Sequence, residues 1–412
     1  MSRRTRRVFR SVFSVFSVAA PSVFSVLSVA ALSVCSVLSV AVLSVCSVLS
    51  VAVDVDAQSF PSAPLWKKDI SARPIPVAPP VAAAERLFLA LETGISARRM
   101  SDGAEIWTNK IVVDGPMAAS EGFLIVQSGG ELRAFSAESG NDVWRDKPGK
   151  VTAPPLVHGP WLFVAADQQL IAYQVSDGTK RWTQELGVIE QRPAFEGAHM
   201  YVPVADGQLV ALIVESGKEL WRQDVGIKPT EPLVYADRIF VGSAAKFFYS
   251  LKMIDGQEAW RFDVGAAVIG RATADAANVY FVALDNLVRA HERRNGELRW
   301  KADLRYRPSA GPTLAGDGVS APGMWATMES FSVKTGKSVS RLTLGDKLAT
   351  VPVFLETPRG LLLAAVTGNL NNQWSLTLAG PPPVTPPVLS IQPLTVLPGI
   401  PIRLGVVTIP RG

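Results

Sequence analysis

The chain repeats one pattern of hydrophobic and polar positions. A largely apolar run is followed by a polar residue, a glycine, three further residues and a tryptophan. Clear copies are ISARRMSDGAEIW (95–107), LIAYQVSDGTKRW (170–182) and LVALIVESGKELW (209–221), and others occupy 132–144, 248–260 and 287–300. The apolar run is typical of a strand, and Asp-Gly favours a tight turn because glycine tolerates positive φ. Each copy therefore predicts a hairpin whose second strand carries the tryptophan.

The pattern returns with a nearly constant period. A seventh copy at 329–340 keeps Gly336 but has Ser340 in place of tryptophan. The seven turn glycines follow one another at intervals of 37 to 40 residues: Gly103, Gly140, Gly178, Gly217, Gly256, Gly296 and Gly336. Two more strand candidates precede each hairpin, at 192–195 and 199–204 in the fourth unit. Four strands in such a unit are typical of one β-propeller blade.

The number of blades follows from the outermost strands. Trp66, in PLWKKDI (64–70), has no hairpin before it, while 351–379 supplies three strands and lacks a fourth. Trp66, the six later tryptophans and Ser340 give eight outermost strands. The sequence therefore predicts an all-β, eight-bladed β-propeller of four-stranded blades over 58–379. The N-terminal strand would close the last blade, which removes two free sheet edges.

The ten tryptophans divide into two groups. Seven occupy the repeated position, and we expect each to pack between neighbouring blades rather than to form a ligand cage. Trp161, Trp325 and Trp374 lie outside this register, and we expect them in the core or at a rim.

Both ends of the chain differ from the repeats. Residues 1–57 begin with five arginines, and the uncharged stretch 11–53 consists of four copies of an 11-residue unit, the last one residue short. A positive start before an apolar stretch predicts a secretory signal or a membrane anchor. Cleavage, retention in the membrane through 11–53 and lipidation are open, although valine before each cysteine argues against lipidation. Residues 380–412 hold nine prolines and predict a disordered tail.

Charge and cysteine content argue against some classes of function. The net charge is +5, but removing 1–57 leaves 36 Lys and Arg against 34 Asp and Glu. A nearly neutral surface gives no electrostatic case for a nucleic-acid partner. Cys35 and Cys46 both lie in the N-terminal segment, so the predicted propeller has no disulfide, thiolate nucleophile or cysteine metal site.

No other residues form a recognisable catalytic pattern. His158, His199 and His291 fall in different repeats without metal-ligand spacing, and we expect ordinary surface or strand-end histidines. The basic run 289–294 is interpreted as a solvated hairpin edge. No G-x-S-x-G elbow occurs. We therefore expect no catalytic residue, no cofactor and no metal site, and hence no enzyme.

The Asp/Thr-Gly-x-x-x-Trp ending and the period near 39 residues, over about 62–379, resemble the PQQ-like repeat family. With an export signal, the chain is similar to the outer-membrane assembly factors of that family. This resemblance implies a non-catalytic scaffold in the periplasm or cell envelope that binds envelope proteins, with the outer-membrane assembly machinery as the candidate partner.

Two alternative functions stay open. A PQQ-dependent quinoprotein dehydrogenase shares the blade type, but such enzymes are usually longer and often contain an adjacent cysteine pair, which is absent here. A periplasmic propeller that binds a glycan or small ligand at the channel mouth is neither supported nor opposed by the sequence.

Overall fold

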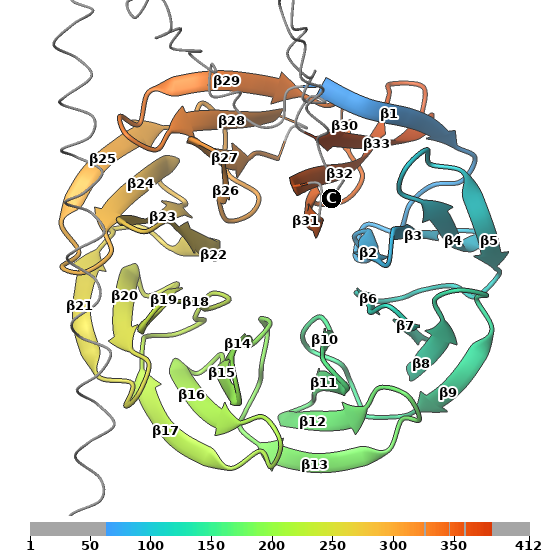
Figure 1. Cartoon of the computed structure of the whole chain (residues 1–412), viewed down its shortest axis with the longest axis horizontal. Helices are drawn as coiled ribbons and strands as arrows, with labels where there is room; N and C mark the ends of the chain where they lie inside the picture. The colour runs from blue at the N-terminus through green and yellow to red at the C-terminus, as the bar shows by residue number, and fades with distance from the viewer. Residues whose placement is uncertain (1–62, 325–326, 346, 358–359, 381–412) are drawn as a thin grey trace, which may run out of the picture. The chain divides into compact units, whose positions relative to one another are not determined.

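The protein forms eight antiparallel sheets arranged as blades around a central axis (Figure 1). The computed structural model describes residues 63–380, apart from 325–326, 346 and 358–359. The predicted N-terminal segment, most of the predicted tail and Trp325 lie outside these residues. Within the described part of the chain, no helix is both long and apolar enough to span a bilayer. The predicted all-β, eight-bladed propeller is confirmed.

Seven blades are four-stranded meanders whose strands follow one another from the axis outwards. Blades 1 to 3 comprise β2 (Val81–Ala83), β3 (Arg86–Leu91), β4 (Gly94–Arg99) and β5 (Glu105–Asn109); β6 (Ala118–Ala119), β7 (Phe123–Ser128), β8 (Glu131–Ser136) and β9 (Asp142–Asp146); and β10 (Leu156–His158), β11 (Trp161–Ala166), β12 (Gln169–Gln174) and β13 (Lys180–Glu185). Blades 4 and 5 comprise β14 (Ala194–Glu196), β15 (His199–Pro203), β16 (Gln208–Ile213) and β17 (Glu219–Asp224); and β18 (Leu233–Tyr235), β19 (Arg238–Gly242), β20 (Phe247–Lys252) and β21 (Glu258–Asp263). Blades 6 and 7 comprise β22 (Val268–Ala274), β23 (Asn278–Ala283), β24 (Leu287–Glu292) and β25 (Leu298–Asp303); and β26 (Thr313–Ala315), β27 (Gly318–Pro322), β28 (Thr327–Ser332) and β29 (Ser338–Thr343).

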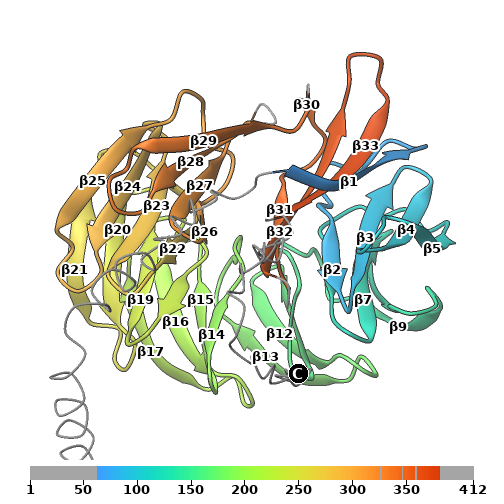
Figure 2. The same ribbon diagram turned by 45° about the horizontal axis from the view of Figure 1, so that its top comes forward.

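Blade 8 is assembled from both ends of the described chain. It contains β31 (Val353–Thr357), β32 (Gly360–Gly368), β33 (Trp374–Gly380) and, as its outermost strand, β1 (Ala63–Ile70). β1 runs antiparallel to β33 from Ala63 opposite Gly380 to Ile70 opposite Trp374 (Figure 2). The predicted closure by the N-terminal strand is therefore confirmed.

One strand of this last sheet was not predicted. β30 (Lys347–Leu348) also pairs with β32. The physical reason is length, because β32 has nine residues and β31 has only five. The part of β32 that extends beyond β31, at Thr367 and Gly368, pairs with β30.

Burial along a blade depends on the position of the strand. The third strand β12 is buried at its four central residues, whereas the outermost strand β13 alternates between exposed and half-buried positions. Second and third strands have a neighbouring blade against each face, so both faces require apolar residues. Outermost strands contact a neighbour on one face only. The core therefore consists of the layers between blades, and each blade depends on the next.

The hairpin of each repeat is a four-residue loop that ends in glycine. In blade 3 the backbone N–H of Gly178 donates to the carbonyl oxygen of Gln174, and Gly178 has φ of 72°. Asp177 Oδ1 accepts the N–H of Thr179 at 2.8 Å, a bond that holds the pKa of the Asp177 carboxyl below its usual value. The register then shifts by one residue after Ala172, which places Trp182 opposite that small side chain. Glycine and aspartate thus have separate local roles.

Each repeat tryptophan lies against the glycine turn of the next blade. A Cβ atom added to Gly178 would be 2.7 Å from Cδ2 of Trp144, and the Trp144 indole donates a 2.8 Å hydrogen bond to the carbonyl oxygen of Val175. The same packing pairs Trp66 with Gly103, Trp107 with Gly140, Trp182 with Gly217, Trp221 with Gly256, Trp260 with Gly296 and Trp300 with Gly336. The prediction that these seven side chains pack between blades is confirmed.

The missing tryptophan of blade 7 has a structural reason. Ser340 lies opposite Ser330, at the place where the other blades carry the indole. Blade 8 has no turn between its third and outermost strands, because β33 and β1 come from distant parts of the chain. A tryptophan at position 340 would therefore have no glycine turn to cover.

Candidate functional site

The connections of the meander divide between two faces of the propeller. We call loop face the end that holds the second-to-third-strand turns and the connections between blades, and turn face the end that holds the other turns. Backbone bridges join the two kinds of loop-face segment in several blades: Pro74 with Leu91, Val151 with Ala166, Pro229 with Ser243 and Pro308 with Gly323. Each of these connections is therefore fixed by a backbone bridge to the blade that it enters.

Exposed large apolar side chains in the described loops gather on the loop face. They are Val77, Val112, Val188, Ile227, Met324, Val351 and Leu370, whereas the described turn face carries Ile254. Other exposed apolar residues lie singly on outermost strands. The loop face is therefore the more apolar of the two described faces, which favours it as the surface that a protein partner covers.

A charged cluster links three blades near the inner strands. Arg192 precedes β14, Glu231 precedes β18 and Arg271 lies in β22. The Nε atom of Arg271 is 3.9 Å from Oε1 of Glu231. Burial raises the pKa of the Glu231 carboxyl, while the two guanidinium groups act in the opposite direction. The ion pair joins the inner segments of blades 5 and 6, and Arg192 contributes a positive charge from blade 4.

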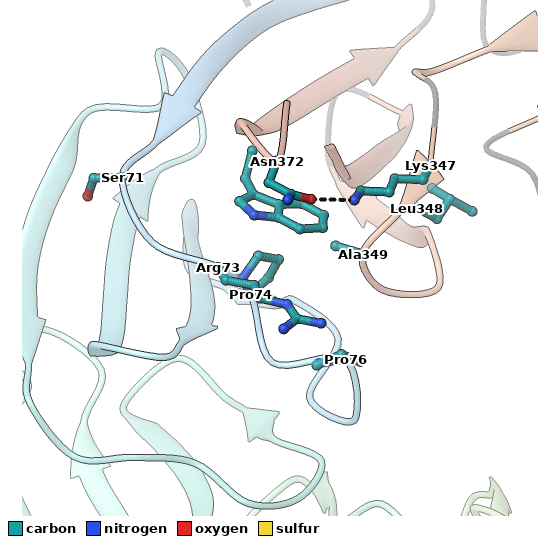
Figure 3. A pocket seen from close by; sticks show the side chains of 9 residues that line it. Ser71, Arg73, Pro74, Pro76, Lys347, Leu348, Ala349 and Asn372 are labelled. Carbon is teal, nitrogen blue, oxygen red and sulfur yellow. Dashed lines mark hydrogen bonds between the residues drawn. The ribbon is translucent and has the colours of Figure 1, made fainter. Parts of the chain in front are cut away.

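Two cavities of about 690 and 590 Å³ adjoin each other between blade 8 and the segment that leads into blade 1. Both are lined by Ser71, Asn372 and Trp374. In the larger one, Lys347 donates a 2.7 Å hydrogen bond to Oδ1 of Asn372, and Arg73 lies on the facing segment (Figure 3). Volumes of this size accommodate small organic ligands.

The structure separates the three histidines. His158 is exposed and stacks on Phe195 of the next blade, with ring centroids 4.3 Å apart, and His199 is exposed at the start of β15. His291 departs from the prediction because it is completely buried. Its Nδ1 atom lies 2.8 Å from the carbonyl oxygen of Gly296, and burial lowers the pKa of its imidazole. Within the described residues, no group of three or more His, Cys, Asp or Glu could hold a metal ion.

The interpretation of 289–294 as a solvated edge is also wrong in part. The side chain of Arg289 is buried and forms an ion pair with Asp285, and the guanidinium of Arg293 lies 5.1 Å from the ring centroid of Tyr235. Arg294 is exposed as expected. The reason is that β24 is a third strand, so its side chains face neighbouring blades on both sides.

The off-register tryptophans occupy different surroundings. Trp161 begins β11 and is partly buried against the core between blades 3 and 4, as expected. Trp374 begins β33 and lines both cavities. Sequence reasoning missed this role, as it missed the loop-face apolar residues. The available signal was an unrepeated tryptophan directly after the polar run Asn371–Gln373.

These features define a class of protein. Eight blades, closed by the N-terminal strand and interlocked by tryptophan and glycine, form a PQQ-like repeat propeller. The chain belongs to the family described as outer membrane protein assembly factor BamB, whose sequence profile matches residues 51–149, 128–234 and 214–351. No curated protein matches the chain.

Solved structures show the same fold at low sequence identity. BamB from Moraxella catarrhalis is 18% identical, with a TM-score of 0.63 over 76% of this chain and 99% of that one. Saccharomyces cerevisiae Sqt1 is 10% identical, with a TM-score of 0.64 over 76% and 98%. Quinohemoprotein alcohol dehydrogenase from Comamonas testosteroni is 13% identical, with a TM-score of 0.61 over 77% and 76%. Because an outer membrane protein assembly factor and an alcohol dehydrogenase share this fold, the fold alone does not assign the function.

Proposed function

We propose that the protein is a non-catalytic scaffold of the cell envelope that binds a protein partner through its loop face. The observation that carries this proposal is the gathering of exposed apolar side chains on that face, among them Val188 and Ile227. Covering such side chains contributes about 25 cal/mol per Å² of apolar surface removed from water. The family match and the predicted export signal favour a partner in the assembly of outer membrane proteins.

The absence of catalysis is part of the proposal. It is supported by the sequence, because both cysteines lie in the N-terminal segment and no adjacent cysteine pair occurs. Adding pyrroloquinoline quinone, Ca²⁺ and an alcohol with an electron-accepting dye tests it. We expect no dye reduction above the rate without protein, and quinone-dependent reduction would contradict the proposal.

The partner surface is tested by site-specific photocrosslinking in the cells that make the protein. A photoreactive amino acid at Val188, Ile227 or Met324 should give an adduct with a component of the outer-membrane assembly machinery, identified by mass spectrometry. Ile254 is the matched control, because it is an exposed apolar residue on the turn face.

The outcomes separate the possibilities. Adducts from the three loop-face positions and none from Ile254 support the proposal. Equal adducts from both faces, or none with an envelope assembly protein from any position, contradict it. As a second measurement, Val188→Asp with Ile227→Asp should weaken co-purification of the crosslinked partner at least about tenfold, because charge is introduced where apolar surface is covered.

A further inference from the structure

The two cavities beside Trp374 have different chemical character. The larger is lined by Pro74, Pro76, Leu348 and Ala349 together with Arg73 and Lys347, and none of its described lining residues carries a carboxylate. The smaller is lined mainly by polar side chains, including Asn369, Gln373, Thr367, Ser375, Lys67 and Asp69. Because they share Ser71, Asn372 and Trp374, the two form one depression with a cationic end and a hydroxyl- and amide-rich end.

The cationic end is suited to an anionic group. Arg73 has only a loose ion pair, since its Nη1 atom lies 3.7 Å from Glu92 Oε1 and both side chains are more than half exposed. Such a pair contributes little to stability, so the guanidinium can bind another carboxylate at low cost. Lys347 donates to the neutral amide of Asn372 and therefore keeps its charge uncompensated by that contact.

The indole of Trp374 lies between the two ends. A Cβ added to Gly368 would be 2.7 Å from Cζ3 of Trp374, so only glycine on β32 lets the ring lie across the sheet there. The Lys347 ammonium is 4.9 Å from the centroid of the ring. Trp374 is half-buried and lines both cavities. A flat apolar surface beside polar donors suits the body of a ring-shaped, hydroxylated molecule.

We propose that this depression is a binding site for an acidic oligosaccharide. One sugar ring packs on Trp374, its carboxylate lies between Arg73 and Lys347, and hydroxyl groups of the next ring bond to Asn372 and Gln373. The site lies on the loop face, at the junction of blade 8 and the segment that enters blade 1. It is tested on the protein without the partner proposed above, so the two proposals can fail separately.

Calorimetric titration of the protein with trigalacturonic acid tests the proposal. The uncharged comparison probe is the fully methyl-esterified trisaccharide, which keeps the rings and loses the charge. We expect the acid to bind at least about tenfold more tightly than the ester, because only the carboxylate can form charge-assisted hydrogen bonds with Arg73 and Lys347. The double variant Arg73→Gln, Lys347→Gln should weaken acid binding at least about tenfold and abolish the preference over the ester.

Two controls make the result decisive. Lys218→Gln removes a lysine from a turn-face hairpin and should leave both affinities unchanged. Trp374→Ala should weaken both probes, and its thermal midpoint shows whether the blade still folds; if it does not fold, the charge variants decide. No binding of the acid at millimolar concentration, equal affinity for acid and ester, or acid binding unaffected by the double variant would overturn the proposal.

Discussion

The indole nitrogen of Trp66 donates a 2.8 Å hydrogen bond to the carbonyl oxygen of Met100. Trp66 lies on the outermost strand of blade 8, and Met100 directly follows β4 of blade 1. Two residues 34 positions apart therefore join the last blade to the first. The bond is of the same kind as those between successive blades, such as Trp300 to Val333 at 2.8 Å. The ring closes with the contact that its repeats already use.

The explanation for Ser340 leads to a paired mutational test. Trp300→Ser should lower the free energy of unfolding by about 3 kcal/mol, because it removes the indole that covers Gly336 and its hydrogen bond. Ser340→Trp should change it by less than about 1 kcal/mol, because blade 8 has no glycine turn to receive the ring. Urea unfolding monitored by circular dichroism measures both. If Ser340→Trp raised the free energy of unfolding by as much as Trp300→Ser lowers it, the missing glycine turn would not explain the serine at position 340.

The turn glycines should differ in their tolerance of alanine. Gly140 has φ of 73°, and a Cβ there would be 2.6 Å from Cε3 of Trp107. Gly197 has φ of 56° but no atom within 4 Å of such a Cβ. Gly197→Ala should therefore cost about 1–2 kcal/mol for the left-handed backbone alone, and Gly140→Ala a further 1–3 kcal/mol, roughly, for the steric overlap. If urea unfolding shows the same loss of unfolding free energy for both variants, the packing of Trp107 does not require a glycine at position 140.

Burial of His291 should make stability depend on pH. Burial lowers the pKa of its imidazole below the ordinary 6.5, so on acidification the unfolded chain takes up this proton first. The contribution of the neutral His291 imidazole to the free energy of unfolding is therefore fully present above pH 6.5. It is lost as the pH falls towards the folded-state pKa. Between about pH 7.5 and about pH 5.5, the wild type should lose more unfolding free energy than His291→Gln, by at most about 1.4 kcal/mol per pH unit below 6.5.

The exposed position of His199 supplies the control for this measurement. His199→Gln should keep the pH dependence of the wild type in urea titrations at both values. If His291→Gln and the wild type respond identically to acid, the buried imidazole does not contribute the expected linkage.

The sequence was informative wherever a structural requirement is local and repeated. The turn at Gly178 needs a positive φ, and the indole of Trp144 needs a neighbour without a side chain, so each blade carries the same signature. The lone strand at Trp66 and the incomplete set after residue 351 together indicated closure. The number of blades and their connection therefore follow from the order of residues along the chain.

Other features depend on segments that only the ring brings together. The cavity at Trp374 joins residues 71–76 to 347–349 and 372–374, which have no shared local pattern. His291 and Arg289 have polar side chains, and nothing local shows that a neighbouring blade covers each face of their strand. The exposed apolar residues of the loop face lie in connections that do not repeat, so their common location follows only from the topology.

Closure of the ring by β1 is the central claim, and a disulfide bond measures it most directly. Lys67 of β1 pairs with Thr377 of β33. In a chain with Cys35→Ser and Cys46→Ser, the changes Lys67→Cys and Thr377→Cys should give one intramolecular disulfide on mild oxidation, because adjacent antiparallel strands bring paired Cα atoms within bridging distance. Mass spectrometry and a non-reducing gel should show the cross-link in most molecules, and none when Lys67→Cys is combined with Lys218→Cys. Absence of the Lys67–Thr377 cross-link from folded protein would contradict a ring closed by the N-terminal strand.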